Sequence, residues 1–304
     1  MQFSVKVNAL IAASLLALTG CGESSESVAA ITQAQSISLD KQQPTSPERV
    51  IALANGSAEI IASLGYLDVL VGRDIASTSK ELKGVPIATA GHQVVPEKIL
   101  ELNPDVVLVD NTTGPATALE VIQRAGIKVT MIDEAWTLTD IAKKIEAIGE
   151  VIGAQSAAAQ LVQKLNSALQ DSGKDHPGVR IAFLYLRGGS AIYLLGGQGS
   201  GADSLIEHLG AIDVGAQKFT QAFSPITSES LITTDPEIIL VMSKGLESVG
   251  GIDGLVSLPG IAQTKAGKNR AVIAVDDSLL LSFGPRTPDL LRQLSSAIGQ
   301  VSGR

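Results

Sequence analysis

Two similar segments of the sequence decide the fold class. Residues 97–109 read EKILELNPDVVLV, and residues 229–241 read ESLITTDPEIILV. In each segment a glutamate is followed by a proline seven residues later, and proline cannot donate a hydrogen bond within a helix or a sheet. A nearly all-apolar run follows, as is typical of strands covered on both faces. The pattern therefore predicts a short helix followed by a buried strand, in two copies, and hence two related lobes.

The sequence around these segments alternates between strand-like and helix-like runs. The strand-like runs, rich in β-branched residues, lie at residues 49–54, 105–110, 127–133, 179–186, 237–242 and 270–276. Alternation of this kind predicts parallel strands with helical crossovers. Residues 138–171 carry no strand signal, and Leu161, Leu165 and Leu169 recur on one face of a helix.

We therefore expect an α/β fold in which a single long α-helix joins two Rossmann-like lobes. The expected N-terminal lobe covers residues 48–135, the helical connector residues 136–176 and the C-terminal lobe residues 177–304. Two lobes joined by one stiff helix leave a cleft between them, which is a usual place for a ligand.

Composition excludes several classes of protein. The 304 residues are 45% hydrophobic and 18% charged, which provides enough apolar material for two lobes and excludes disorder for the bulk of the chain. The net charge is −8 without a basic stripe, so we expect no nucleic-acid partner. One cysteine and three histidines exclude a disulfide framework and a cysteine-rich metal site.

The N-terminus predicts export. Residues 1–6 carry one positive charge, and the apolar stretch at residues 7–18 is too short for a membrane span of about 20 residues. The following Leu-Thr-Gly-Cys21 resembles a lipobox, which implies a lipoprotein signal peptide at residues 1–20 and acyl chains on Cys21 that anchor the mature protein to a membrane. An ordinary signal peptide cleaved nearby is the alternative. Residues 21–47 are rich in Ser, Gln, Ala and Thr and are expected to form a flexible tether.

Several ordered motifs resemble one family of transport proteins. The lipobox-like ending, RVI at residues 49–51, SAEIIASLG at residues 57–65 and the unit at residues 97–109 are similar to substrate-binding proteins of ABC importers. The resemblance covers about residues 48–300 and is strongest to the class with a rigid helix between the lobes, which serves haem, siderophores and cobalamin. It implies a periplasmic-binding-protein fold, a permease with its ATPase as partners, and no enzymatic activity. We expect a monomer in the periplasm or on the outer face of the cytoplasmic membrane.

Within this class the chain resembles the HmuT-type haemin-binding lipoproteins. A glycine precedes His92 in the first lobe, and Tyr185 and Arg187 close the first strand of the second lobe. The resemblance implies that His92 and Tyr185 coordinate the iron of haem b, that Arg187 lies beside the tyrosine, and that Met242 contacts the haem. Independently, side chains two positions apart share one face of a strand, which places Arg187 next to Tyr185. Ferric iron and a neighbouring guanidinium both favour the phenolate form of a tyrosine.

Two glutamates are candidate docking residues. Glu97 and Glu229 occupy equivalent places in the repeat and match the glutamates that, in related importers, bind arginines of the permease. Favourable interaction of a carboxylate with a helix N-terminus is the simpler explanation for both.

Other interpretations remain open. A siderophore- or cobalamin-binding protein is the first alternative, and an exported α/β enzyme is the second. The GQGSGA run at residues 197–202 fits a loose dinucleotide-binding fingerprint, but no clear acidic residue ends a second strand about 20 residues further on. The STSK run at residues 77–80 fits the S-x-x-K motif without its companion motifs. His176 and His208 are expected to be structural or surface residues.

Overall fold

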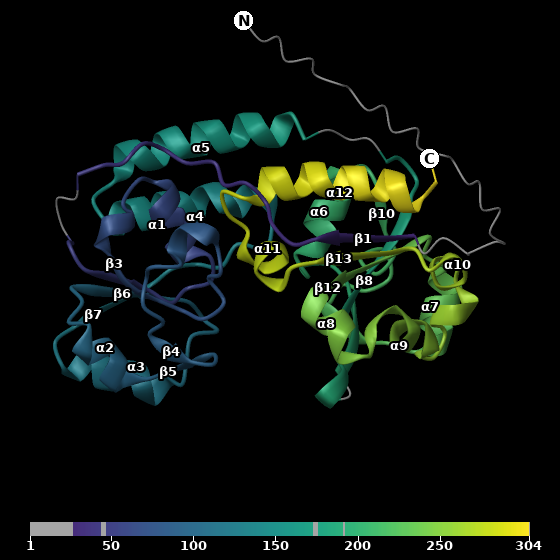
Figure 1. Cartoon of the computed structure of the whole chain (residues 1–304), viewed down its shortest axis with the longest axis horizontal. Helices are drawn as coiled ribbons and strands as arrows, with labels where there is room; N and C mark the ends of the chain where they lie inside the picture. Colours follow the sequence, from purple (N-terminus) through teal and green to yellow (C-terminus); the bar gives the residue numbers. More distant parts are fainter. Residues whose placement is uncertain (1–26, 44–46, 173–175, 191, 304) are drawn as a thin grey trace, which may run out of the picture.

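The computed structural model describes residues 27–43, 47–172, 176–190 and 192–303. Two α/β lobes lie side by side, the N-terminal lobe in blue and the C-terminal lobe in green and yellow (Figure 1). The predicted α/β class is confirmed. The predicted signal peptide and Cys21 lie outside the described residues.

The N-terminal lobe is built on a parallel four-stranded sheet with the order β3-β2-β6-β7. Its strands are β2 (Val50–Ala52), β3 (Leu70–Arg73), β6 (Val106–Val109) and β7 (Lys128–Met131). A separate hairpin consists of β4 (Thr89–Ala90) and β5 (Gln93–Val94). The helical elements are α1 (Ser57–Ser63), η1 (Leu67–Val69), η2 (Lys80–Leu82), α2 (Pro96–Glu101) and α3 (Ala116–Arg124).

The C-terminal lobe is built on a seven-stranded sheet with the order β1-β13-β12-β8-β9-β11, in which β10 also pairs with β8. Its strands are β1 (Val28–Ile31), β8 (Arg180–Arg187), β9 (Ile192–Gly196), β10 (Ile212–Asp213), β11 (Phe223–Pro225), β12 (Ile238–Met242) and β13 (Val272–Val275). The helical elements are η3 (Gly188–Ser190), α6 (Ala202–His208), α7 (Ser228–Thr234), α8 (Ser243–Ser248), α9 (Gly251–Ser257), η4 (Ile261–Gln263), α10 (Lys265–Asn269), α11 (Asp277–Ser282) and α12 (Thr287–Val301).

The sheet topology confirms the repeat. Parallel strands follow the order β3-β2-β6-β7 in the first lobe and β10-β8-β12-β13 in the second. Helix α2 precedes β6 as α7 precedes β12. Every residue of β6 and β12 is buried, because helices cover both faces of each sheet and only apolar side chains can fill both.

The connector differs from the prediction of a single helix. It contains two helices, α4 (Leu138–Val151) and α5 (Gln155–Gln170), which pack against each other. Gly153 adopts a φ of +67°, a left-handed conformation that ends α4 and that glycine adopts without steric cost. Helix α5 also packs against α12, and Leu161, Leu165 and Leu169 are buried in a core that includes residues of both lobes.

The predicted flexible tether is wrong for residues 28–42. Strand β1 pairs in parallel with β13, placing Val28 opposite Val272. Beyond it the backbone N–H of Leu39 donates to the Ser63 carbonyl at 2.8 Å, so this segment continues from the C-terminal sheet to α1 of the N-terminal lobe, as the purple trace shows (Figure 1). Only alternate residues of β1 are buried, which is why so short a run lacks a clear strand signal.

Candidate functional site

A cleft of about 640 Å³ lies between the lobes. Its walls are the loops that follow β2, β3, β6 and β7, the β4–β5 hairpin, the end of β8, the start of α8 and the loop after β13. In parallel α/β sheets the carboxyl ends of the strands carry the ligand-binding loops, and here both sheets direct those ends to the same cleft.

His92 reaches the cleft from the N-terminal lobe. It lies in the turn between β4 and β5, is exposed, and lines the cleft. Gly91 precedes it with a φ of +57°, a conformation that other residues disfavour, whereas a Cβ atom at this position would meet only open space. The glycine is therefore explained by the backbone of the turn that presents His92.

Tyr185 and Arg187 line the opposite wall, at the end of β8. The Arg187 guanidinium lies over the Tyr185 ring, 4.7 Å from its centroid, as the strand alternation predicts. Phe223 packs edge-on against Tyr185, with 5.5 Å between the two ring centroids. Asp277 lies 3.8 Å from an Arg187 nitrogen, so a carboxylate and a phenol ring hold the guanidinium in place.

Lys144 of α4 also lines the cleft, although only 5% of it is exposed. Its ammonium donates to the Asn55 carbonyl and, at 3.5 Å, to the Ser282 carbonyl. Burial lowers the pKa of Lys144 to about 8, with Asp110, Glu134 and Glu59 acting in the opposite direction. A buried ammonium therefore lies where the two lobes and the connector meet.

Acidic and aromatic side chains complete the lining. Burial raises the pKa of Asp74, whose carboxylate accepts hydrogen bonds from Ser77 and from the Ala76 amide. Trp136 donates from Nε1 to Glu134 at 2.9 Å, and both residues line the cleft.

Comparison with known proteins defines the family. The family model for periplasmic binding proteins matches residues 50–279. The chain belongs to this family.

A relative and two solved structures agree with this assignment. The uncharacterized ABC transporter substrate-binding lipoprotein YvrC of Bacillus subtilis (strain 168) is 26% identical over 272 residues, which cover 87% of this chain and 82% of YvrC. The apo periplasmic heme-binding protein RhuT from Roseiflexus sp. RS-1 is 31% identical with a TM-score of 0.77, covering 84% of this chain and 99% of RhuT. The heme-binding protein HmuT is 28% identical with a TM-score of 0.77, covering 91% of this chain and 98% of HmuT.

HmuT has also been solved as variants that carry alanine in place of a histidine, a tyrosine or an arginine, and that arginine lies two positions after that tyrosine. The relatives of this periplasmic binding protein include an ABC transporter substrate-binding lipoprotein, a vitamin B12-binding protein of Vibrio campbellii (strain ATCC BAA-1116) and two heme-binding proteins. Substrate-binding proteins of ABC transporters are not enzymes.

The structure also corrects a prediction about the binding site of this periplasmic binding protein. Met242 ends β12 with none of its side chain exposed and belongs to the apolar core. It does not line the cleft, so the expected haem contact is not supported. The strand position was predicted correctly, but the direction of the side chain depends on which face of the sheet the core covers.

The predicted docking residues lie at equivalent places outside the cleft. Glu97 is in the first turn of α2 and Glu229 in the first turn of α7, and both are exposed. His176 and His208 also lie apart from the cleft lining, each with its Nε2 2.9 Å from a serine hydroxyl, Ser295 and Ser172 respectively.

Sequence reasoning missed Lys144, although a signal was present. Ile141, Ile145 and Ile148 form the buried stripe of α4, and Lys144 falls on the same stripe. A lysine in an apolar stripe is buried when the helix packs, so its ammonium needs polar partners there. Lys144 differs in this respect from its neighbour Lys143, which is exposed to solvent.

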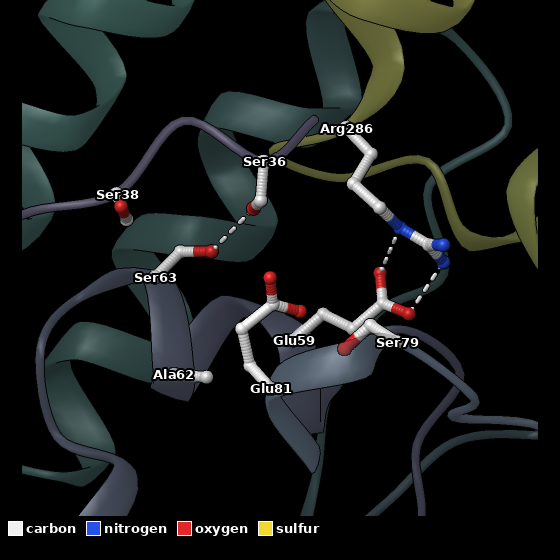
Figure 2. Close-up of a pocket in the computed structure, with 8 residues that line it drawn as sticks. All are labelled: Ser36, Ser38, Glu59, Ala62, Ser63, Ser79, Glu81 and Arg286. Carbon is white, nitrogen blue, oxygen red and sulfur yellow. Dashed lines mark hydrogen bonds and ion pairs between the residues drawn. The ribbon is translucent and has the colours of Figure 1, made fainter. Parts of the chain in front are cut away.

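A second, smaller cavity of about 60 Å³ lies beside a buried ion pair between the lobes (Figure 2). Glu59 of α1 accepts two hydrogen bonds from Arg286, which precedes α12; one of them measures 2.9 Å. Burial raises the pKa of Glu59 to about 7 even though Arg286 acts in the opposite direction. Figure 2 shows the two side chains meeting end-on, with Ser36, Ser63 and their mutual hydrogen bond nearby.

Within the part of the chain that the structure describes, no three His, Cys, Asp or Glu side chains are grouped so as to hold a metal ion. No helix in that part is long and apolar enough to cross a membrane.

Proposed function

We propose that this protein is the extracytoplasmic haem-binding component of an ABC importer, which captures haem b in the cleft and delivers it to the permease. The observation that carries the proposal is the pairing of His92, from one lobe, with Tyr185 and Arg187, from the other, around a single cleft. Met242 is not part of the proposed site.

The chemistry of these side chains suits ferric haem. Imidazole and phenolate are both known axial ligands of haem iron, and residues on opposite walls can approach the two faces of a planar macrocycle. The phenolate neutralises part of the ferric charge, and the Arg187 guanidinium lies over the Tyr185 ring. Trp136, Ile75 and Leu281 add apolar surface to the cleft for the porphyrin ring.

The relatives support the same ligand. RhuT and HmuT are heme-binding proteins, and the spacing of Tyr185 and Arg187 equals that of the tyrosine and arginine replaced in HmuT. By the same reasoning we propose that the protein has no catalytic activity, that it acts as a monomer with a permease and its ATPase, and that acyl chains on Cys21 hold it at the outside of a membrane. The name of YvrC as a lipoprotein supports the anchor.

Titration of the purified protein with haemin tests the ligand. We expect a Soret band that differs from that of free haemin, together with quenching of the fluorescence of Trp136, which is the only tryptophan and lines the cleft. A Trp136→Phe variant should lose the fluorescence signal and keep the Soret change. Parallel titrations with cobalamin and with a ferric siderophore provide the comparison: saturable binding of either one, without haemin binding, would establish the alternative function and overturn this proposal.

A further inference from the structure

The ammonium of Lys144 lies at the junction of the two lobes. It donates to the carbonyl of Asn55, which follows β2, and makes a long hydrogen bond of 3.5 Å to the carbonyl of Ser282, at the end of α11. An ammonium has three N–H donors, so these two carbonyls leave one donor available. Lys144 is among the residues that line the cleft, which places its side chain next to a ligand bound there.

The carboxylates around Lys144 are occupied by other donors. Oδ2 of Asp110 accepts a hydrogen bond from the backbone N–H of Asn55 at 2.7 Å. Oδ1 accepts hydrogen bonds from the backbone N–H and the hydroxyl of Thr112 and from the hydroxyl of Thr113, at 2.8 to 3.0 Å. The remaining two neighbours are also bonded elsewhere: Glu134 accepts from Trp136, and Glu59 accepts both hydrogen bonds of Arg286.

Lys144 therefore has a buried charge without a direct counterion. Among the described residues, no carboxylate forms an ion pair with it, and burial lowers its pKa to about 8. Buried charges in proteins are usually paired, because desolvation of an unpaired ion is costly. A cation with these surroundings, on the wall of a ligand cleft, is suited to binding an anionic group of the ligand.

We propose that Lys144 forms an anion subsite on the wall of the cleft, which binds a carboxylate of the ligand by a charge-assisted hydrogen bond. The inference rests on the proposed function for the identity of that carboxylate, which for haem is a propionate. Charge-assisted hydrogen bonds are shorter and stronger than neutral ones, and the low exposure of Lys144 limits screening by water. Lys144 would thus orient the macrocycle, while His92 and Tyr185 hold its iron.

The experiment compares haemin with haemin dimethyl ester, which keeps the iron and the ring but has no carboxylate. The wild-type protein should bind haemin about ten- to a hundredfold more tightly than the ester. Lys144→Met should reduce this ratio to near one, mainly by weakening haemin. Lys143→Met is the matched control, since Lys143 is exposed on the same helix and pairs with Asp140, and it should keep the wild-type ratio.

The two proposals fail in different ways. A preference for haemin that survives in Lys144→Met, or a wild-type protein that binds both compounds equally, would overturn the subsite and leave haem binding standing. Absence of binding of both compounds to the wild-type protein would overturn both proposals. Lys144→Gln keeps a donor for the Asn55 carbonyl and serves as the second variant if Lys144→Met does not fold, as judged by circular dichroism.

The pH dependence of the wild-type ratio gives a test that needs no variant. Lys144 loses its proton as the pH rises through its pKa, which is about 8 in the free protein and higher once a carboxylate is bound. The groups that act on it are Asp110, Glu134 and Glu59; because burial raises the pKa of Glu59 to about 7, the comparison is made above that pH. The preference for haemin over the ester should decline between pH 8 and pH 10, and a preference that stays constant over this range would contradict the subsite.

Discussion

The Arg187 guanidinium lies over the face of the Tyr185 ring, 4.7 Å from its centroid, and 3.8 Å from Asp277. This geometry holds a positive charge beside a candidate iron ligand before any haem is bound. The Tyr185 phenol is partly buried against Phe223 and opens to the cleft, so little rearrangement is needed for it to reach a ligand. Preorganisation of this kind reduces the entropic cost of binding.

Replacing Arg187 should weaken haemin binding without abolishing it. Loss of a cation–π contact and of a positive charge at a half-exposed site should lower the affinity for haemin by about three- to tenfold. We expect Arg187→Ala to lower haemin affinity by this amount and to keep the absorption features that arise from ligation of the iron by Tyr185. Arg187→Lys, which keeps the charge, should recover part of the loss. An unchanged affinity for Arg187→Ala would show that the contact does not assist ligation.

Replacing either proposed ligand should change the haem spectrum. Tyr185→Ala should reduce haemin affinity more than His92→Ala, because the anionic phenolate neutralises part of the ferric charge and the exposed imidazole does not. In each single variant the cleft and the other ligand should still hold haem. Spectra that match the wild type in both variants would exclude these residues as ligands.

The equivalent glutamates should matter for transport and not for binding. Glu97 and Glu229 are exposed, lie outside the cleft lining and occupy matching first turns of α2 and α7. A Glu97→Ala, Glu229→Ala double variant should bind haemin with wild-type affinity and lose most haem uptake in cells that carry the permease. Uptake at the wild-type rate would leave both glutamates as simple helix N-terminal carboxylates.

Cys21→Ala should release the protein from the membrane. One or two acyl chains provide most of the affinity of a lipid-anchored protein for a bilayer. Cell fractionation should find the variant in the soluble extracytoplasmic fraction, and the recovered protein should bind haemin normally because the residues that line the cleft lie far from Cys21 in the chain. A Ser25→Ala protein provides the control and should stay with the membrane fraction.

Breaking the Glu59–Arg286 pair should destabilise the fold. Glu59→Gln leaves Arg286 buried without its counterion, at a cost of about 3–5 kcal/mol in the free energy of unfolding. Glu59→Leu combined with Arg286→Met removes both charges and should cost less than either single replacement. Urea denaturation of the wild type, Glu59→Leu, Arg286→Met and the double variant measures the coupling, and additive losses would show that the two residues do not interact.

Local sequence patterns were sufficient for the class of the fold and for part of the site. They predicted the α/β class, the six strand-like runs that became β2, β6, β7, β8, β12 and β13, and the repeat that relates the lobes. They also placed Arg187 beside Tyr185, because the alternation of side chains along a strand is a property of the backbone itself. Such features depend on neighbours within a few residues, so the sequence carries them directly.

Tertiary contacts, in contrast, determine which side chains face the cleft and which face the core. Met242 lies on a predicted strand, yet its side chain is buried because the core covers that face of β12. Lys144 lies on an apolar helical stripe, yet it reaches the cleft because Asn55 and Ser282, far away in the chain, supply its carbonyl partners. Strand β1 exists because β13 offers an edge with which it can pair. Each of these outcomes depends on contacts between distant segments, and no pattern within a segment specifies them.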